Sequence, residues 1–253
     1  MAVARPTPDT NAFSPLRMGL EPLKLERWLA PRPADDHLLA ARKDIIAAHR
    51  SEVIAALPGS NDALTELADL LRGRGVVATE NAPTDKVLET IGTSIAEDIC
   101  ILTGRDGIYR LSAAVLCFPN RWRLADKMGR DVTAIHAPVP DYAAQAAGAV
   151  DRFLEKLRPL RAFVRDNWGL VASPTLYLPE PASAARISTE QSLYYRREEQ
   201  SFLKLPLTQA IIFAIRTTVT PWADVPARRR EAIIGAAQQL SADWLAYKAL
   251  DID

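Results

Sequence analysis

The sequence has little of the residue types from which most protein-built cofactor sites are made. Its 253 residues include two cysteines and three histidines. Two thiols cannot form a four-cysteine zinc site or hold an iron–sulfur cluster. Cys100 and Cys117 both stand in apolar sequence, where cysteine acts as a small hydrophobic residue. The chain also lacks a G-x-G-x-x-G loop and a Walker loop. Electrons for any redox reaction would therefore come from another polypeptide.

Net charge and long apolar runs are absent as well. Lysine and arginine together number 31, as do aspartate and glutamate, so no overall field favours nucleic acid or anionic lipid. No apolar run approaches the ~20 residues of a membrane helix, and the first residues lack the apolar core of a signal peptide. We therefore expect a cytoplasmic protein that binds neither nucleic acid nor a membrane.

The hydrophobic pattern predicts an α+β fold. Residues 1–35 are rich in proline and predict an extended arm, whereas residues 36–253 predict one domain. Helices are expected over 36–57, 62–71, 84–95, a short stretch from 119, 142–157, and 226–248 with a break near Ser241. Strands are expected over 99–102, 109–118, 162–171, 193–203 and 210–219, and an ordered loop over 131–140. This layout predicts a mostly antiparallel sheet with the helices packed on one face.

His136 differs from the other two histidines in its surroundings. His37 lies beside two aspartates at a helix start and His49 lies on a helix, so both are expected at the surface. His136 stands in Ala134-Ile135-His136-Ala137-Pro138-Val139-Pro140, and a buried imidazole must find a partner. It is either a core histidine bonded to a backbone carbonyl or a neutral axial ligand of a haem iron. A porphyrin supplies four further nitrogens, so one histidine would suffice.

The predicted strand over 193–203 carries polar side chains. Alternation places five residues on one face: Tyr194, Arg196, Glu198, Gln200 and Phe202. Arg197 and Glu199 then lie on the other face. The first face is either a solvated sheet surface with cross-strand ion pairs or a polar patch in a pocket. In a pocket, arginine would suit an anionic group and glutamate a cationic one.

Two further segments combine arginine with tryptophan. Arg165 precedes Trp168 on a predicted strand, and Trp122 lies between Arg121 and Arg123. Arginine and tryptophan commonly hold haem propionates, but they also make ordinary surface contacts. Both interpretations stay open from these residues alone.

Taken together and in this order, these segments resemble the haem-dependent oxidative N-demethylase-like family. The resemblance rests on Ala96-Glu97-Asp98-Ile99, Leu116-Cys117-Phe118-Pro119-Asn120-Arg121-Trp122, Lys127-Met128-Gly129, Ile135-His136-Ala137-Pro138-Val139-Pro140, Arg165-x-Asn167-Trp168, Arg196-x-Glu198-x-Gln200-x-Phe202-x-x-Leu205-Pro206 and Phe213-Ala214-Ile215-Arg216-Thr217. These stretches lie within residues 38–247, and the I-H-x-P-V-P and R-x-E-x-Q…L-P elements are specific in combination. The chain departs from the family at Glu199 and Lys204, where arginine is usual.

The resemblance implies a PAS-like sheet, with haem b enclosed between the sheet and its flanking helices. It also implies oxidation of a small secondary amine such as dimethylamine by O2, which gives methylamine and formaldehyde. Electrons in that family come from NADPH through separate flavin and iron–sulfur partner proteins, in agreement with the cofactor motifs that are missing here.

On this interpretation His136 is the haem ligand. The candidates for the propionates are Arg196, Arg165 and Arg123, with Trp122 nearby. Glu198 is expected to pair with an ammonium substrate beside the aromatic faces of Tyr194 or Tyr195, or else to pair with Arg196 and orient it. The alternatives are a non-catalytic haem-binding or sensor protein on the same fold, and an accessory protein that has lost the cofactor.

Overall fold

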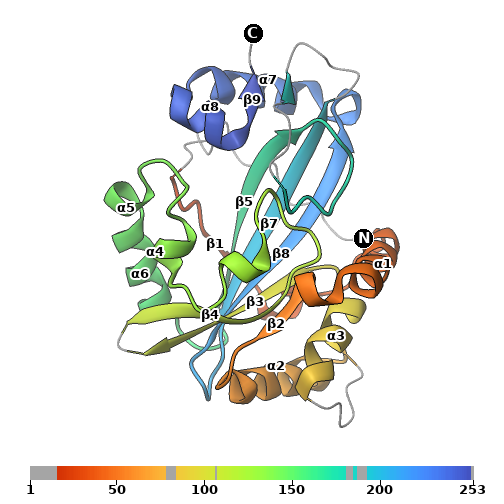
Figure 1. Cartoon of the computed structure of the whole chain (residues 1–253), viewed down its shortest axis with the longest axis vertical. Coiled ribbons are helices and arrows are strands. Elements are labelled where there is room, and N and C mark those ends of the chain that lie inside the picture. Colours follow the sequence, from red (N-terminus) through yellow and green to blue (C-terminus); the bar gives the residue numbers. More distant parts are fainter. Residues whose placement is uncertain (1–15, 78–83, 106, 181–184, 187–192, 252–253) are drawn as a thin grey trace.

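The computed structural model describes residues 16–77, 84–105, 107–180, 185–186 and 193–251. Within them, seven strands form one antiparallel sheet in the order β1-β5-β7-β8-β3-β4-β2 (Figure 1). The strands are β1 (Glu21–Leu23), β2 (Ile54–Ala56), β3 (Asp98–Arg105), β4 (Ile108–Val115), β5 (Ala162–Val171), β7 (Tyr194–Lys204) and β8 (Ile211–Pro221). Two short strands, β6 (Ala185–Arg186) and β9 (Leu250–Asp251), form a parallel pair. The α+β class is confirmed, and this antiparallel sheet is compatible with a PAS-like arrangement.

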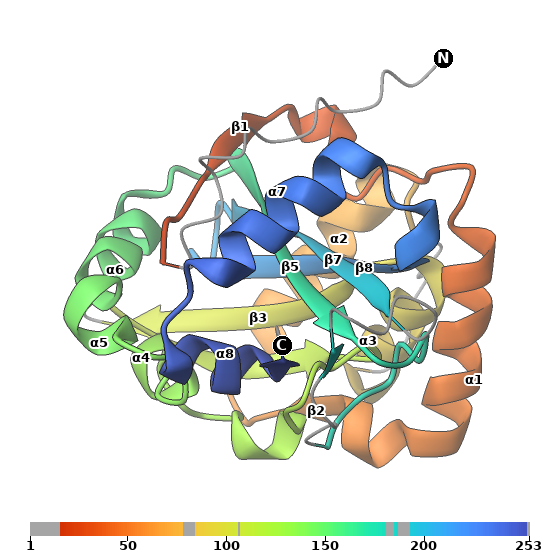
Figure 2. The same cartoon turned by 90° about the horizontal axis from the view of Figure 1, so that it is seen from above.

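Helices cover both faces of the sheet (Figures 1 and 2). The helices are α1 (Asp36–Val53), α2 (Asn61–Gly73), α3 (Thr84–Ser94), α4 (Val132–Ile135), α5 (Tyr142–Gln145), α6 (Ala147–Lys156), α7 (Ala227–Gln238) and α8 (Ala242–Lys248). Ile99 and Ile101 of β3 pack with the buried residues of α1–α3, whereas Cys100 and Leu102 pack with those of α4–α6. The predicted packing of helices on one face is therefore wrong, because both sides of the central strands are apolar.

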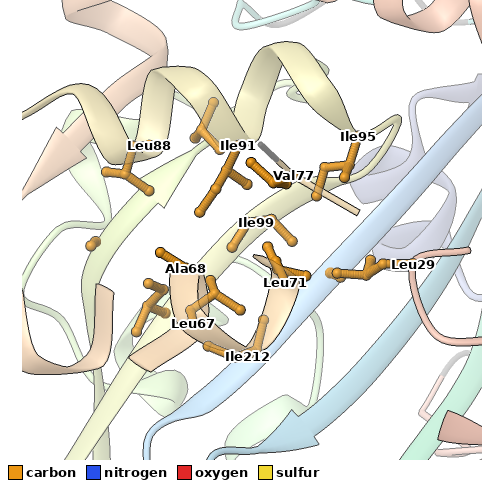
Figure 3. Packing of buried hydrophobic residues seen from close by; sticks show 14 of the residues in the cluster. Leu29, Leu67, Ala68, Leu71, Val77, Leu88, Ile91, Ile95, Ile99 and Ile212 are labelled. Atoms are coloured by element: carbon orange, nitrogen blue, oxygen red, sulfur yellow. The ribbon is translucent and has the colours of Figure 1, made fainter. Parts of the chain in front are cut away.

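One core cluster joins α2 and α3 to the middle of the sheet (Figure 3). Leu67 and Leu71 of α2 and Ile91 of α3 meet Ile99 of β3 and Ile212 of β8, and all five side chains are fully buried. Burying a side chain of this size contributes ~1.5–3 kcal/mol relative to leaving it in water. This cluster fixes α1–α3 against the sheet and leaves the opposite face to α4–α6.

The predicted element bounds hold for most strands and fail at three helices. The helix expected to reach residue 57 ends at Val53, and Ile54–Ala56 pair with β4 instead. Val53 and Ile54 are β-branched, which favours an extended chain over a helical one. The helix expected over 142–157 is divided at Ala146 into α5 and α6. The short helix expected from 119 is reduced to the 3-10 turn Leu124–Asp126.

The N-terminal residues add to the sheet rather than only lying over it. Residues 1–15 of the expected arm lie outside the described residues, whereas β1 pairs with β5 and Trp28 is completely buried in the core. Further 3-10 turns occur at Leu25–Arg27 and Trp222–Asp224. At the other end of the chain the predicted break is confirmed, since Ser241 accepts a hydrogen bond from the amide of Trp244 and caps α8. None of the helices in the described ranges has the length and apolarity to span a membrane.

Candidate functional site

A short helix carries His136. The expected loop over 131–140 contains α4, because the side chain of Asp131 caps it by accepting the Ala134 amide at 2.8 Å. His136 is the residue that ends this helix. Its Nδ1 lies 2.8 Å from the carbonyl oxygen of Val132, and its ring stacks on Tyr142 with centroids 4.5 Å apart and planes at 10°. Because a carbonyl oxygen can only accept, Nδ1 carries the hydrogen and donates a hydrogen bond to Val132.

The charge state of His136 follows from these surroundings. Burial lowers its pKa, the hydrogen bond to Val132 raises it, and the charges of Arg165 and Lys127 lower it further; the net direction is downward. The ring is therefore neutral at pH 7, with its lone pair on Nε2. Among the described residues, no hydrogen bond engages that nitrogen. A neutral imidazole whose Nδ1–H is held by a backbone carbonyl is the arrangement found in metal-ligating histidines.

Glu198 lies at the centre of a group of cations on one face of β7. Its Oε2 accepts hydrogen bonds from Asn167 at 3.1 Å and Gln200 at 3.0 Å, and its Oε1 is 3.7 Å from Nε of Arg196. Burial lowers the pKa of four surrounding cations, and the charge of Glu198 raises each of them. We call this group the Glu198 cluster; it consists of Arg121, Arg165, Arg196, Glu198 and Lys248.

The register of the sheet explains why these side chains meet. Asn167 of β5 pairs with Glu198 of β7, and Arg165 pairs with Gln200, so all four side chains lie on one face. Further along this face, Phe202 packs on Phe153 of α6. The predicted alternation along β7 is thus confirmed, and the polar patch lies on the face that α4–α6 cover.

Arg196 uses most of its guanidinium to hold the backbone. The residue is 1% exposed, and its Nη2 donates to the carbonyl of Phe118 at 2.7 Å while its Nη1 donates to that of Leu176 at 3.2 Å. These bonds tie the segment after β4 to the segment after β5. Arg196 therefore has fewer free donors for a ligand than its rank among the sequence candidates suggested.

The remaining candidates are divided between this face and the surface. Arg165 lies close enough to His136 to influence its pKa. Arg123 instead points to solvent and pairs with Glu180, with Nε 2.7 Å from the carboxylate. The structure thus brings Arg165 to the histidine and leaves Arg123 apart.

The two aromatic candidates also lie in different places. Trp122 is partly buried and packs against the core cluster of α4–α6. Tyr194 is partly buried at the first position of β7. It is four positions from Glu198, which corresponds to roughly 13 Å along a strand. Trp122 is thus part of the packing beneath the site, and Tyr194 lies at its far end.

Three residues of the site were not selected from the sequence. Tyr142 follows His136 by six positions and covers its ring. Arg121 was noted only as a neighbour of Trp122. Lys248 comes from α8, at the far end of the chain, and its Nζ donates to the carbonyl of Trp168 at 2.8 Å. No local pattern links Lys248 to β5; only the tertiary structure brings them together.

This face also has unused hydrogen-bonding capacity. Several buried polar atoms on or beside it have no partner among the described residues: Asn120 Oδ1, Tyr142 OH, Arg165 Nε, Arg196 Nε and Thr217 Oγ1. A hollow of about 490 Å³ lies beside α4 and α5; its lining includes Asp131, Asp141 and Tyr142, but not His136 or the Glu198 cluster. Buried polar groups are normally paired; unpartnered atoms of this kind also occur elsewhere, at Trp28, Arg42, Arg74 and Glu97.

The sequence model of one family covers this whole region. That family is described as haem-dependent oxidative N-demethylase, alpha subunit-like, and its model matches residues 70–252, well over half of the chain. The chain belongs to this family. None of the curated proteins gives a significant match. The matched range contains His136, the Glu198 cluster and all strands of the sheet except β1 and β2.

The residues of this family member fit a haem in two respects. His136 offers a neutral nitrogen with a free lone pair, and one such ligand suffices where a porphyrin supplies the others. The Glu198 cluster contains four cations and one carboxylate, and this excess of positive charge matches the two carboxylates of a haem.

Proposed function

We propose that the protein is a haem b-dependent oxidative N-demethylase, an oxidoreductase that converts a small secondary amine such as dimethylamine to methylamine and formaldehyde. Membership of the family supports the haem dependence. The observation that carries the proposal is the state of His136: neutral, held at Nδ1 by the carbonyl of Val132, and with Nε2 free. The same family implies a haem pocket between the sheet and its helices.

The chain's own residues would hold the cofactor and position the substrate. His136 would ligate the iron through Nε2, Tyr142 would fix the plane of the imidazole, and Arg165 would bind a propionate. Haem b, when bound, supplies the activation of O2 and the oxidation of the N-methyl carbon. Arg196 would act indirectly by fixing the two segments whose carbonyls it binds.

The amine would be placed by Glu198 and Tyr194, on the first of two hypotheses. Glu198 would pair with the ammonium group, and the ring of Tyr194 would cover its methyl groups. On the second hypothesis Glu198 is the counter-charge that orients Arg196. The surplus of cations around Glu198 favours the second hypothesis, because a cationic substrate gains little in a region that is already positive.

Of the two departures from the family pattern, Lys204 lies on this face of β7, beyond Phe202, and Glu199 does not. Glu199 lies on the opposite side of β7, where it pairs with Arg32 and with Arg197. Lys204 is buried at the end of the strand and donates to the carbonyl of Glu155 at 2.9 Å. Strand alternation directs Glu199 away from the face that carries Glu198.

The electron supply is proposed from the family alone. Its description as an alpha subunit supports assembly with further subunits. We propose that NADPH is the electron source and that separate flavin and iron–sulfur proteins deliver the electrons, in the cytoplasm.

The absorption spectrum of the protein reconstituted with haemin tests the proposal. Wild type should give a stoichiometric Soret band, and His136→Ala should abolish it or convert it to the spectrum of an unligated haem. His37→Ala and His49→Ala are matched controls, because His49 is half exposed and pairs with Glu52. An unaltered band in His136→Ala would show that another group binds the iron.

Turnover separates the enzyme from its alternatives. With a reductase system, wild type should release formaldehyde from dimethylamine. Bound haem without turnover of any N-methyl amine would indicate a haem-binding or sensor protein. Absence of haem binding would indicate an accessory protein.

A further inference from the structure

The Glu198 cluster holds more positive charge than its own residues neutralise. Arg121, Arg165 and Lys248 each lie within Coulombic range of Glu198, and so does the fully buried Arg196. Glu198 is the carboxylate that all four cations share, while Asp98 also acts on Arg196 and Asp166 on Arg165. Among the described residues, Glu198 is the one carboxylate that acts on Arg121 and Lys248. Like charges repel strongly in a poorly solvated region, so these two cations call for an anion that the described residues do not supply.

Arg121 has its guanidinium free and its backbone fixed. Its φ of 62° is in the left-handed region, which a non-glycine residue rarely adopts. The strained backbone is held by the hydrogen bond from its amide to the carbonyl of Leu178 at 2.6 Å. No hydrogen bond or ion pair to a described residue engages the side chain, whose charge lies near Glu198 and Tyr247.

Lys248 is the counterpart of Arg121 from the C-terminal helix. Its Nζ lies 4.7 Å from the centre of the Trp168 ring and donates to the carbonyl of the same residue. An ammonium group has three N–H donors, and this bond uses one of them among the described residues. Burial lowers the pKa of Lys248 to about 8, Glu198 raises it, and Arg121 and Arg165 lower it. The ammonium group thus lies buried with donors to spare.

We infer that Arg121 and Lys248 together bind a carboxylate of the ligand, the second one beside that held by Arg165, so that α8 completes the binding site. This inference rests on the proposed function, since a porphyrin dicarboxylate is the anion in question. The inference goes beyond the proposed function because it assigns a role to Arg121 and Lys248. Lys248 lies on a helix at the opposite end of the chain from α1–α3.

Metal-free protoporphyrin IX and its dimethyl ester provide the test. Binding is followed by porphyrin fluorescence, so neither the iron ligand nor catalysis enters the readout. Wild type should prefer the diacid to the diester by tenfold or more. Arg121→Met and Lys248→Met should each weaken binding of the diacid about tenfold, which is 1.4 kcal/mol, and leave binding of the diester unchanged. Arg123→Met, which removes an exposed cation paired with Glu180, is the matched control and should bind both as wild type does.

A pH series of the preference for the diacid over the diester provides a second test, because a misfolded variant would not reproduce its pH dependence. The groups facing Lys248 are Glu198 on β7, Arg165 on β5 and Arg121 after β4, with Tyr247 beside it on α8. The pKa of Lys248 is about 8, whereas burial raises that of Tyr247 above 10. The preference of wild type for the diacid should fall as the pH rises above about 8, and Lys248→Met should lack this fall.

The outcomes separate the inference from the function on which it rests. Equal losses of diacid and diester binding in Arg121→Met and Lys248→Met would overturn the inference, as would unchanged diacid binding in both, while porphyrin binding by wild type would still support the proposed function. Wild-type protein that binds haemin and both porphyrins without discrimination would likewise overturn only the inference. Wild-type protein that binds haemin but neither metal-free porphyrin would overturn the inference alone, and wild-type protein that binds neither haemin nor a porphyrin would overturn both.

Discussion

The molecule contains two groups of buried charges, and they are built differently. In the first, which we call the Asp98 cluster, Arg42 pairs with Asp98 at 2.5 Å with both side chains fully buried, and Arg216 pairs with Asp35 and Glu97. This cluster therefore has three carboxylates for two cations. The Glu198 cluster has one carboxylate for four cations.

The difference separates charges that are paired within the chain from charges that are paired only in part. Asp98 also accepts the amides of Cys117 at 2.6 Å and Phe118 at 3.0 Å, so its carboxylate fixes the end of β4 as well as Arg42. Each charge in this cluster has its partner within the chain. In the Glu198 cluster, Arg121 and Lys248 share the carboxylate of Glu198 with two other cations, and burial makes such incompletely paired cations unfavourable.

The largest effect is expected at the centre of the Asp98 cluster. Asp98→Asn keeps an acceptor for one amide but leaves Arg42 buried without its counter-charge. Removing one partner of a buried pair costs about 3–5 kcal/mol, and we expect a loss of that size in the free energy of unfolding. Urea denaturation measures it. A loss below about 1 kcal/mol would show that the cluster does not stabilise the fold.

Neutralising a cation of the Glu198 cluster should instead raise the free energy of unfolding of the haem-free protein. The pKa of Lys248 is lowered from 10.5 to about 8, which corresponds to about 3 kcal/mol of unfavourable free energy for the charged form in the folded chain. Because Lys248→Met also loses the bond to Trp168, we expect haem-free protein to gain about 1–3 kcal/mol at pH 7. Thermal or urea unfolding without haem tests this, and a destabilised variant would contradict it.

The pH dependence of this difference follows from the direction of the shift. Below about pH 8 the lysine is protonated in both states, and the full penalty is present. Between about pH 8 and 10.5 the unfolded chain binds the proton and the folded chain does not, so wild-type stability rises with pH. The advantage of Lys248→Met should therefore shrink across this interval. A difference that stays constant from pH 7 to 10.5 would place the titration of Lys248 elsewhere.

Removing the single carboxylate sharpens the comparison further. Glu198→Gln keeps the shape and the bonds to Asn167 and Gln200 but removes the carboxylate that the four cations share. We expect haem-free protein to lose about 1–3 kcal/mol, and haem-loaded protein to lose less because the propionates replace the missing charge. Melting temperatures with and without haemin measure both.

The same variant distinguishes the two roles of Glu198. A role in substrate binding predicts that dimethylamine no longer shifts the Soret band of Glu198→Gln, with haem content intact. A counter-charge role predicts a normal shift in the protein that retains haem. If neither stability nor the shift changes, both roles are excluded.

The sequence was most informative where a property is local. Alternation and β-branched residues located β5, β7 and β8, and the apolar surroundings of His136 distinguished it from His37 and His49. The sequence also carries a local signal that helices cover both faces of the sheet. A continuous apolar run such as Ile99–Leu102 is typical of a strand buried on both sides.

Properties that depend on distant partners could not be predicted in this way. Glu97 and Asp98 belong to a stretch that resembles the family, yet only the position of Arg42, 56 residues away, shows that this stretch stabilises the fold. Lys248 looks like the end of an ordinary amphipathic helix until the carbonyl of Trp168 is found 2.8 Å from it. The α4 helix is four residues long and depends on one side-chain cap, which is too little for periodicity to detect.

The smallest effect is expected at Arg123, which the sequence ranked beside Arg165 as a propionate ligand. Arg123 and Glu180 are both more than half exposed, and solvent screens such pairs, so Arg123→Met should change neither the unfolding midpoint nor the rate of haem dissociation. Arg165→Met is the matched comparison inside the Glu198 cluster, where we expect haem affinity to fall by about one to two orders of magnitude. Dissociation of haem into an excess of apomyoglobin measures both. Faster haem loss from Arg123→Met would mean that the ligand's carboxylates reach past Trp122 to the surface. Arg123 would then belong with the cations that bind the ligand rather than with the solvated ones.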